Sequence, residues 1–86
     1  MKNKHIELIT KWLKNRHSVP VDDLEVNAHN AQMAFLAADT DDDETITEIV
    51  YYAAHYAHLA AAYAEDKAED LCKSYVTKYW EFFKCQ

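Results

Sequence analysis

The chain has 86 residues and a net charge of −6, and 50% of its residues are hydrophobic while 28% are charged. This length and composition are typical of one small globular domain, covering residues 1–86. Glycine is absent and the only proline is Pro20, so the residues that tight β-turns need are nearly missing and an all-α fold is predicted. No apolar run approaches the roughly 18 residues of a membrane span, and no apolar secretion signal is present, so we expect a cytoplasmic protein without membrane contact.

The first two helices are predicted over residues 4–16 and 22–38. In the first, Asn3 is suited to cap the N-terminus, and one face is apolar: Ile6, Leu8, Ile9, Trp12 and Leu13. The second begins with a capping box of Asp22 and Glu25, and a hydrophobic staple is expected between Val21 and Val26. Its main apolar face comprises Leu24, Ala28, Ala31, Phe35 and Ala38. The other side also carries apolar residues, which predicts cover from two directions: Val26, Met33 and Ala37.

The connector 39–44, DTDDDE, is the most acidic part of the chain. Carboxylates at the start of a helix complement its free amide groups and its dipole, and Thr40, Asp43 or Thr45 is expected to cap the helix that follows. An EF-hand calcium loop is a poor alternative, because it needs a glycine at its sixth position and the chain has none.

From Glu44 onward an apolar stripe continues across about ten turns: Ile46, Ile49, Val50, Ala53, Ala57, Ala60, Ala64, Ala68, Leu71, Tyr75, Tyr79 and Phe82. Two interpretations remain open. One is a single helix about 60 Å long. The other is a pair of helices, 44–64 and 66–84, with Asp66 and Glu69 forming a second capping box. We favour a break or kink, since the like-charged pairs Glu65/Glu69 and Asp66/Asp70 weaken a continuous helix.

The middle of this stripe is alanine, and the helix before it offers matching alanines. Small residues allow helices to approach closely, so we predict a small bundle of three to four helices with an alanine-lined seam. Because burial of alanine contributes little free energy per residue, self-association into a homo-oligomer is also expected.

Tyrosines and histidines occur on several sides of the predicted helix between residues 51 and 63. Tyr51, His55 and His58 lie on the face away from the alanine stripe, with Tyr52 along one flank. One interpretation packs this face against another helix or a second copy, and the other makes it a binding surface, since tyrosine is enriched at interfaces. A metal site is not predicted, because His55 and His58 have no third ligand nearby.

The sequence gives no support for catalysis or for a cofactor. It has no glycine-rich phosphate loop and no nucleophile elbow. Cys72 and Cys85 are thirteen residues apart on one predicted helix, about 20 Å by helical rise, which is too far for a disulfide. We therefore expect a non-enzymatic protein with reduced thiols.

Charge is distributed unevenly along the chain. Residues 1–20 carry a net +4, residues 21–70 a net −12 and residues 71–86 a net +2. Either the basic ends fold against the acidic middle, or the acidic middle attracts a basic partner. Direct binding of nucleic acid is not expected, because the acidic residues repel phosphates.

The chain resembles small Ala/Tyr-rich helical accessory proteins of tailed bacteriophages. The resemblance lies in four segments in order: KHIELITKWL, SVPVDDLEVNA, an Ala/Tyr-rich middle and YVTKYWEFF. That resemblance implies no activity and no site residues. It implies a setting in which small non-enzymatic proteins bind a host protein, such as a defence nuclease, and block or redirect it.

We therefore expect an accessory protein that binds a host protein. If the acidic connector imitates the phosphates of DNA, that host protein is one that binds nucleic acid. Two alternatives are a homo-oligomer that holds a nucleotide-like ligand in a Tyr/His-lined groove, and a minor structural or scaffold component. The candidate partner-binding residues are Asp39, Asp41, Asp42, Asp43, Glu44, Tyr51, Tyr52, His55 and His58.

Overall fold

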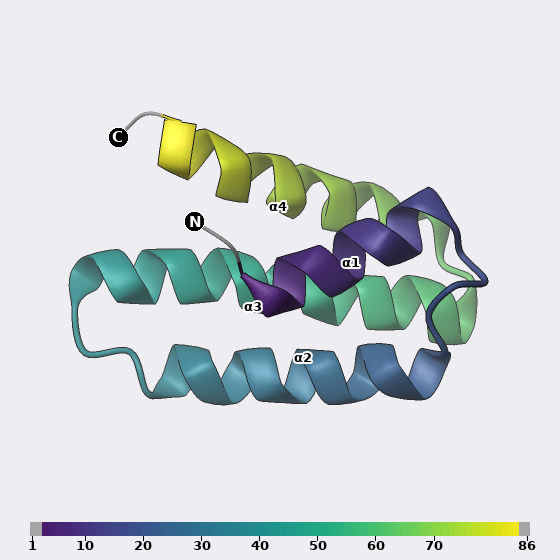
Figure 1. Cartoon of the computed structure of the whole chain (residues 1–86), viewed down its shortest axis with the longest axis horizontal. Coiled ribbons are helices and arrows are strands. Elements are labelled where there is room, and N and C mark those ends of the chain that lie inside the picture. The colour runs from purple at the N-terminus through teal and green to yellow at the C-terminus, as the bar shows by residue number, and fades with distance from the viewer. Residues whose placement is uncertain (1–2, 85–86) are drawn as a thin grey trace.

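The computed structural model describes residues 3–84, with side chains described as far as residue 82. It contains the helices α1 (Lys4–Lys14), α2 (Val21–Leu36), α3 (Asp41–Tyr63) and α4 (Asp66–Lys84), and no strand occurs among the described residues. The predicted all-α bundle is confirmed. In Figure 1, α2 and α4 each run antiparallel to α3, which lies between them, and α1 lies across this layer.

The core lies between α1 and the three-helix layer. From α1 it receives Ile6, Ile9 and Trp12, all nearly inaccessible to solvent. The layer contributes mostly small residues: Leu24, Ala28, Ala31, Val50, Ala53, Ala54, Ala57 and Cys72. The alanine-lined seam between α2 and α3 is therefore present, and the large side chains of α1 and Tyr79 of α4 complete the core.

The starts of α1 and α3 agree with their predicted caps, and the start of α2 does not. The side chain of Asn3 accepts hydrogen bonds from the amides of His5 and Ile6, and Thr40 accepts one from the amide of Asp43 at 3.1 Å. The capping box predicted at the start of α2 is wrong. Pro20 occupies the N-cap position without a side-chain hydrogen bond, so Asp22 already lies inside the first turn.

The residues around α2 correct two further predictions. Val21 and Val26 are 39% and 57% exposed, so no buried staple closes there. The second side of α2 is not covered within the described part of the chain, because Met33 is also half-exposed. The first helix ends at Lys14, two residues early, since Asn15 turns the backbone into an extended conformation.

The expected interruption of the long C-terminal segment is found at Ala64. This residue adopts the left-handed conformation, with φ 53° and ψ 39°, and the chain then reverses into α4. Asp66 is the first residue of α4 rather than its N-cap, so the second predicted capping box is also wrong.

The predicted apolar stripe holds on α4 at all but one position. Ala68 and Tyr79 are buried, whereas Leu71 is 42% exposed and the neighbouring Cys72 lies in the core in its place. None of the helices described here is both long and apolar enough to cross a membrane.

Candidate binding surface

The structure gathers aromatic residues from three helices into one stacked group. We call this group the aromatic surface; it consists of Phe35, Tyr51, Tyr52, His55, Tyr56 and Tyr75. Tyr75 of α4 stacks on Tyr52 and Tyr56, with ring centroids 5.4 and 5.9 Å apart. On the other side of α3, Phe35 of α2 stacks on Tyr51 at 6.1 Å.

Helical periodicity explains where the aromatic surface lies. Tyr51 and His55 are one turn apart on α3, as are Tyr52 and Tyr56. At about 100° per residue, His55 points away from the direction of Ala53 and Ala57, which are buried in the core that α1 covers. The aromatic surface therefore lies on the side of the layer opposite α1, and each of its members is half-buried.

Charged groups border the aromatic surface on both flanks. The ammonium group of Lys78 lies 4.7 Å from the centre of the Tyr75 ring, within the range of a cation–π interaction. On the α2 side, Nε2 of His58 lies 3.8 Å from a carboxylate oxygen of Glu25. The two predicted histidines thus have different neighbours, and among the described residues no group of three metal-ligating side chains occurs.

The predicted acidic residues form a second, separate feature. Asp41, Asp42, Asp43 and Glu44 occupy the first turn of α3, Asp39 precedes them, and all are exposed. In this position they complement the α3 dipole. Ten residues separate Asp41 from Tyr51, about 15 Å along the helix, so the acidic connector adjoins the aromatic surface without being part of it.

Four residues of this region are not among the predicted site residues: Phe35, Tyr56, Tyr75 and Lys78. The sequence analysis places Phe35 and Tyr75 on apolar faces. The spacing of Tyr75 and Lys78 on one helix was a usable signal, because residues three apart share a face. That α4 would bring them beside Tyr52 depended on the turn at Ala64.

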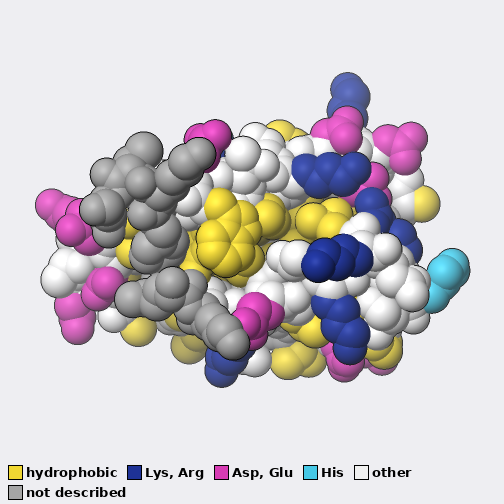
Figure 2. Space-filling view, turned by 45° about the horizontal axis from the view of Figure 1, so that its top comes forward, with side chains coloured by type: hydrophobic (Ala, Val, Ile, Leu, Met, Phe, Trp, Pro, Cys, Tyr) yellow, Lys and Arg dark blue, Asp and Glu magenta, His cyan; other side chains and the backbone are white. Residues whose placement is uncertain are grey.

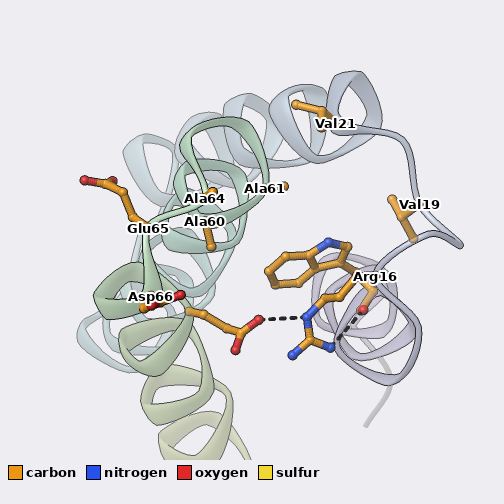
Figure 3. A pocket seen from close by; sticks show the side chains of 10 residues that line it. Arg16, Val19, Val21, Ala60, Ala61, Ala64, Glu65 and Asp66 are labelled. Carbon is orange, nitrogen blue, oxygen red and sulfur yellow. Dashed lines mark hydrogen bonds and ion pairs between the residues drawn. The ribbon is translucent and has the colours of Figure 1, made fainter.

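The cavity in Figure 3 is a structural junction. Its volume is about 300 Å³, and it lies where the α1–α2 connector meets the turn between α3 and α4. Nε of Arg16 donates a hydrogen bond of 2.8 Å to Glu69, and its Nη1 donates to the carbonyl oxygens of Trp12 and Leu13. The guanidinium also lies 5.0 Å from the centre of the Trp12 ring. Arg16 thereby joins α1 to α4.

Two further groups with reactive potential are buried in the core, the thiol of Cys72 and the imidazole of His5, and the surroundings of each indicate a structural role. Burial, helped by the nearby carboxylate of Glu69, raises the pKa of Cys72 to about 12, so its thiol is a poor nucleophile at neutral pH. Nδ1 of His5 lies 2.7 Å from Oδ1 of Asn27, whose amide nitrogen donates to the His5 carbonyl oxygen. This pair fixes α1 on α2. Cys85 lies outside the described residues.

Comparisons with protein-family models, with curated proteins and with solved structures found no match to this chain. Its function must therefore be argued from its own surfaces.

Proposed function

We propose that this chain is a non-enzymatic accessory protein that binds a host protein and inhibits or redirects it, in the manner of small bacteriophage proteins. The observation that carries the proposal is the aromatic surface, a stacked group from three helices that is only half-buried. Tyrosine rings offer large, rigid contact area at a low entropy cost and are enriched where proteins bind one another.

The acidic connector gives this proposal its electrostatic part. Its carboxylates are exposed at one end of α3, and a dense negative patch speeds and orients encounters with a basic partner. A host protein that itself binds nucleic acid has a complementary basic surface. The partner proposed here therefore contacts the aromatic surface and has basic residues facing the acidic connector.

The test is quantitative capture from host lysate with the tagged chain and two variants. Asp41→Lys/Asp42→Lys/Asp43→Lys is expected to abolish capture, and His55→Glu, which places a charge within the aromatic surface, is expected to weaken it at least tenfold. The control Glu65→Lys/Asp66→Lys/Asp70→Lys makes the same charge change near the start of α4 and is expected to retain the partner. Circular dichroism checks that helicity is unchanged.

A single host protein recovered near one-to-one, and lost in both test variants, supports the proposal. Capture that both variants retain contradicts the assigned surfaces. Recovery of the tagged chain alone, as a defined multimer, contradicts the binding of a host protein and favours a homo-oligomeric or structural role.

A further inference from the structure

A second exposed feature lies on the opposite side of the molecule from the aromatic surface. A groove of about 470 Å³ runs between α1 and α4 and is lined by Glu7, Thr10, Lys11, Lys14 and Trp80. We call it the α1–α4 groove. Figure 2 shows exposed hydrophobic side chains in this region with Lys and Arg side chains beside them. Trp80 is 49% exposed, and its ring rests edge-on against buried Tyr79 at 5.0 Å.

The chemistry of the α1–α4 groove selects for an apolar group flanked by carboxylates. The ring of Trp80 and the aliphatic parts of Lys11 and Lys14 provide apolar contact, while the two ammonium groups outweigh the single carboxylate of Glu7 and leave the lining net positive. The Thr10 hydroxyl is buried and has no hydrogen-bond partner among the described residues, which is a costly arrangement that an entering acceptor would relieve.

The same chain carries a surface of that complementary kind at its α2–α3 corner. Leu36, the last residue of α2, is 68% exposed. The acidic residues of the connector begin three residues later, after two alanines, and are exposed: Asp39, Asp41, Asp42 and Asp43. An exposed leucine beside several carboxylates matches a groove that has a half-exposed tryptophan beside two lysines.

We propose that the α1–α4 groove binds the α2–α3 corner of a second copy of this chain. Leu36 of one copy contacts Trp80 of the other, and the acidic connector faces Lys11 and Lys14. The inference goes beyond binding of a host protein and does not depend on it. It has a regulatory consequence, because a copy docked on the acidic connector competes with a basic partner for it.

The two docking surfaces differ, so the contact is head-to-tail. Each copy in a pair keeps one free groove and one free corner, and association continues as concentration rises. Since the contact brings together exposed opposite charges, raising the salt concentration from about 50 to 500 mM is expected to weaken association about tenfold.

Complementation between two variants, followed by sedimentation velocity, tests this geometry. Lys11→Glu/Lys14→Glu disables the groove and keeps the corner, whereas Leu36→Asp disables the corner and keeps the groove. Each variant alone is expected to stay monomeric at concentrations where the unmodified chain associates. Their equimolar mixture is expected to form a one-to-one dimer that grows no further, because only one productive contact remains.

The controls make the same kinds of change elsewhere on the surface. Val26→Asp alters another exposed apolar residue of α2, and Lys67→Glu/Lys73→Glu reverses two exposed lysines of α4. Both controls are expected to associate like the unmodified chain. A chain that is monomeric at every concentration overturns the inference, and so does association that survives in both test variants. A monomeric chain that still captures a host protein overturns this inference alone and leaves the proposed function standing.

Discussion

Arg16 shows how one side chain can meet several needs of a small fold. The last carbonyl groups of a helix have no partner within the helix, and Arg16 donates to two of them at the end of α1. The same guanidinium reaches Glu69 on α4. The hydrogen bond from Arg16 holds the pKa of the Glu69 carboxyl below its ordinary value of 4.5.

This lowered pKa predicts a specific acid sensitivity. The ionised form of Glu69 is favoured in the folded state, so its contribution to stability is present above pH 4.5 and is lost as the pH falls through the lower, folded-state pKa. Glu69→Gln is expected to cost about 0.5–1 kcal/mol at pH 7, since the pair is partly exposed, and less at pH 3. Urea denaturation at both pH values measures this difference.

The control is Asp70→Asn, which neutralises the exposed neighbouring carboxylate. It is expected to have little effect at either pH. An equal loss of stability for Glu69→Gln at pH 7 and pH 3 would show that the ion pair does not contribute.

Other polar contacts at this scale were not predictable from the sequence. His5 precedes the apolar face of α1, yet it is buried against Asn27 of α2. The two residues are far apart in the chain, and nothing local marks them as partners. Local caps such as Asn3 and Thr40 were predictable because their hydrogen bonds span two or three residues.

At the scale of helices, periodicity predicted which segments are helical and where the alanine seam lies. The helix starts were less predictable where two signals competed. At the start of α2, Asp22 is suited to cap a helix, while Pro20 is also suited to a helix start, and the helix begins after Pro20. The break near Ala64 was predicted from like-charge repulsion, from a possible capping box at Asp66 and from the easier burial of two shorter helices. Its left-handed geometry was not predictable, because an alanine in that conformation costs roughly 1–2 kcal/mol.

That cost predicts opposite effects of one substitution at two nearby positions. Ala64→Gly relieves the left-handed alanine and is expected to raise the free energy of unfolding by about 0.5–1 kcal/mol, after the larger entropy of the unfolded glycine chain is subtracted. Ala62→Gly, in the last turn of α3, is expected to lower it by about 1 kcal/mol. Urea denaturation followed by circular dichroism distinguishes the two, and a loss of stability in both variants contradicts the assignment at Ala64.

At the scale of the whole molecule, the sequence predicted a bundle but not its layers. The aromatic surface exists because α3 lies between α2 and α4 while α1 covers only one side.

The idea that charge complementarity sets the packing order of the helices receives limited support. Among the described residues one lysine or arginine of the basic N-terminal part, Arg16, forms an ion pair with the acidic middle, through Glu69.

Cys72 offers a probe of the integrity of the complete fold. It is fully buried in the core, and its pKa is raised to about 12, so a thiol reagent reaches it only when the bundle opens. In a Cys85→Ser background, we expect the labelling rate of Cys72 at pH 8 to rise with urea in parallel with loss of helicity. The matched control is Ser74→Cys in a Cys72→Ala/Cys85→Ser background. Position 74 is exposed, so this thiol is expected to react at once in native buffer. Rapid native labelling of Cys72 would mean that α4 detaches from the rest of the bundle.

The left-handed turn at Ala64 also bears on how copies of the chain can exchange parts. A change of Ala64 and Glu65, the two residues between the helices, to the right-handed helical region would align α3 with α4 as a single rod, and would remove the strain at Ala64. In the rod, α4 is carried away from its own core and can bury Ala68, Cys72 and Tyr79 only in the vacated position of another molecule. Because such an exchanged dimer would re-form the native core contacts of α4 between two molecules, we expect it to compete with the hairpin only at high concentrations of the chain.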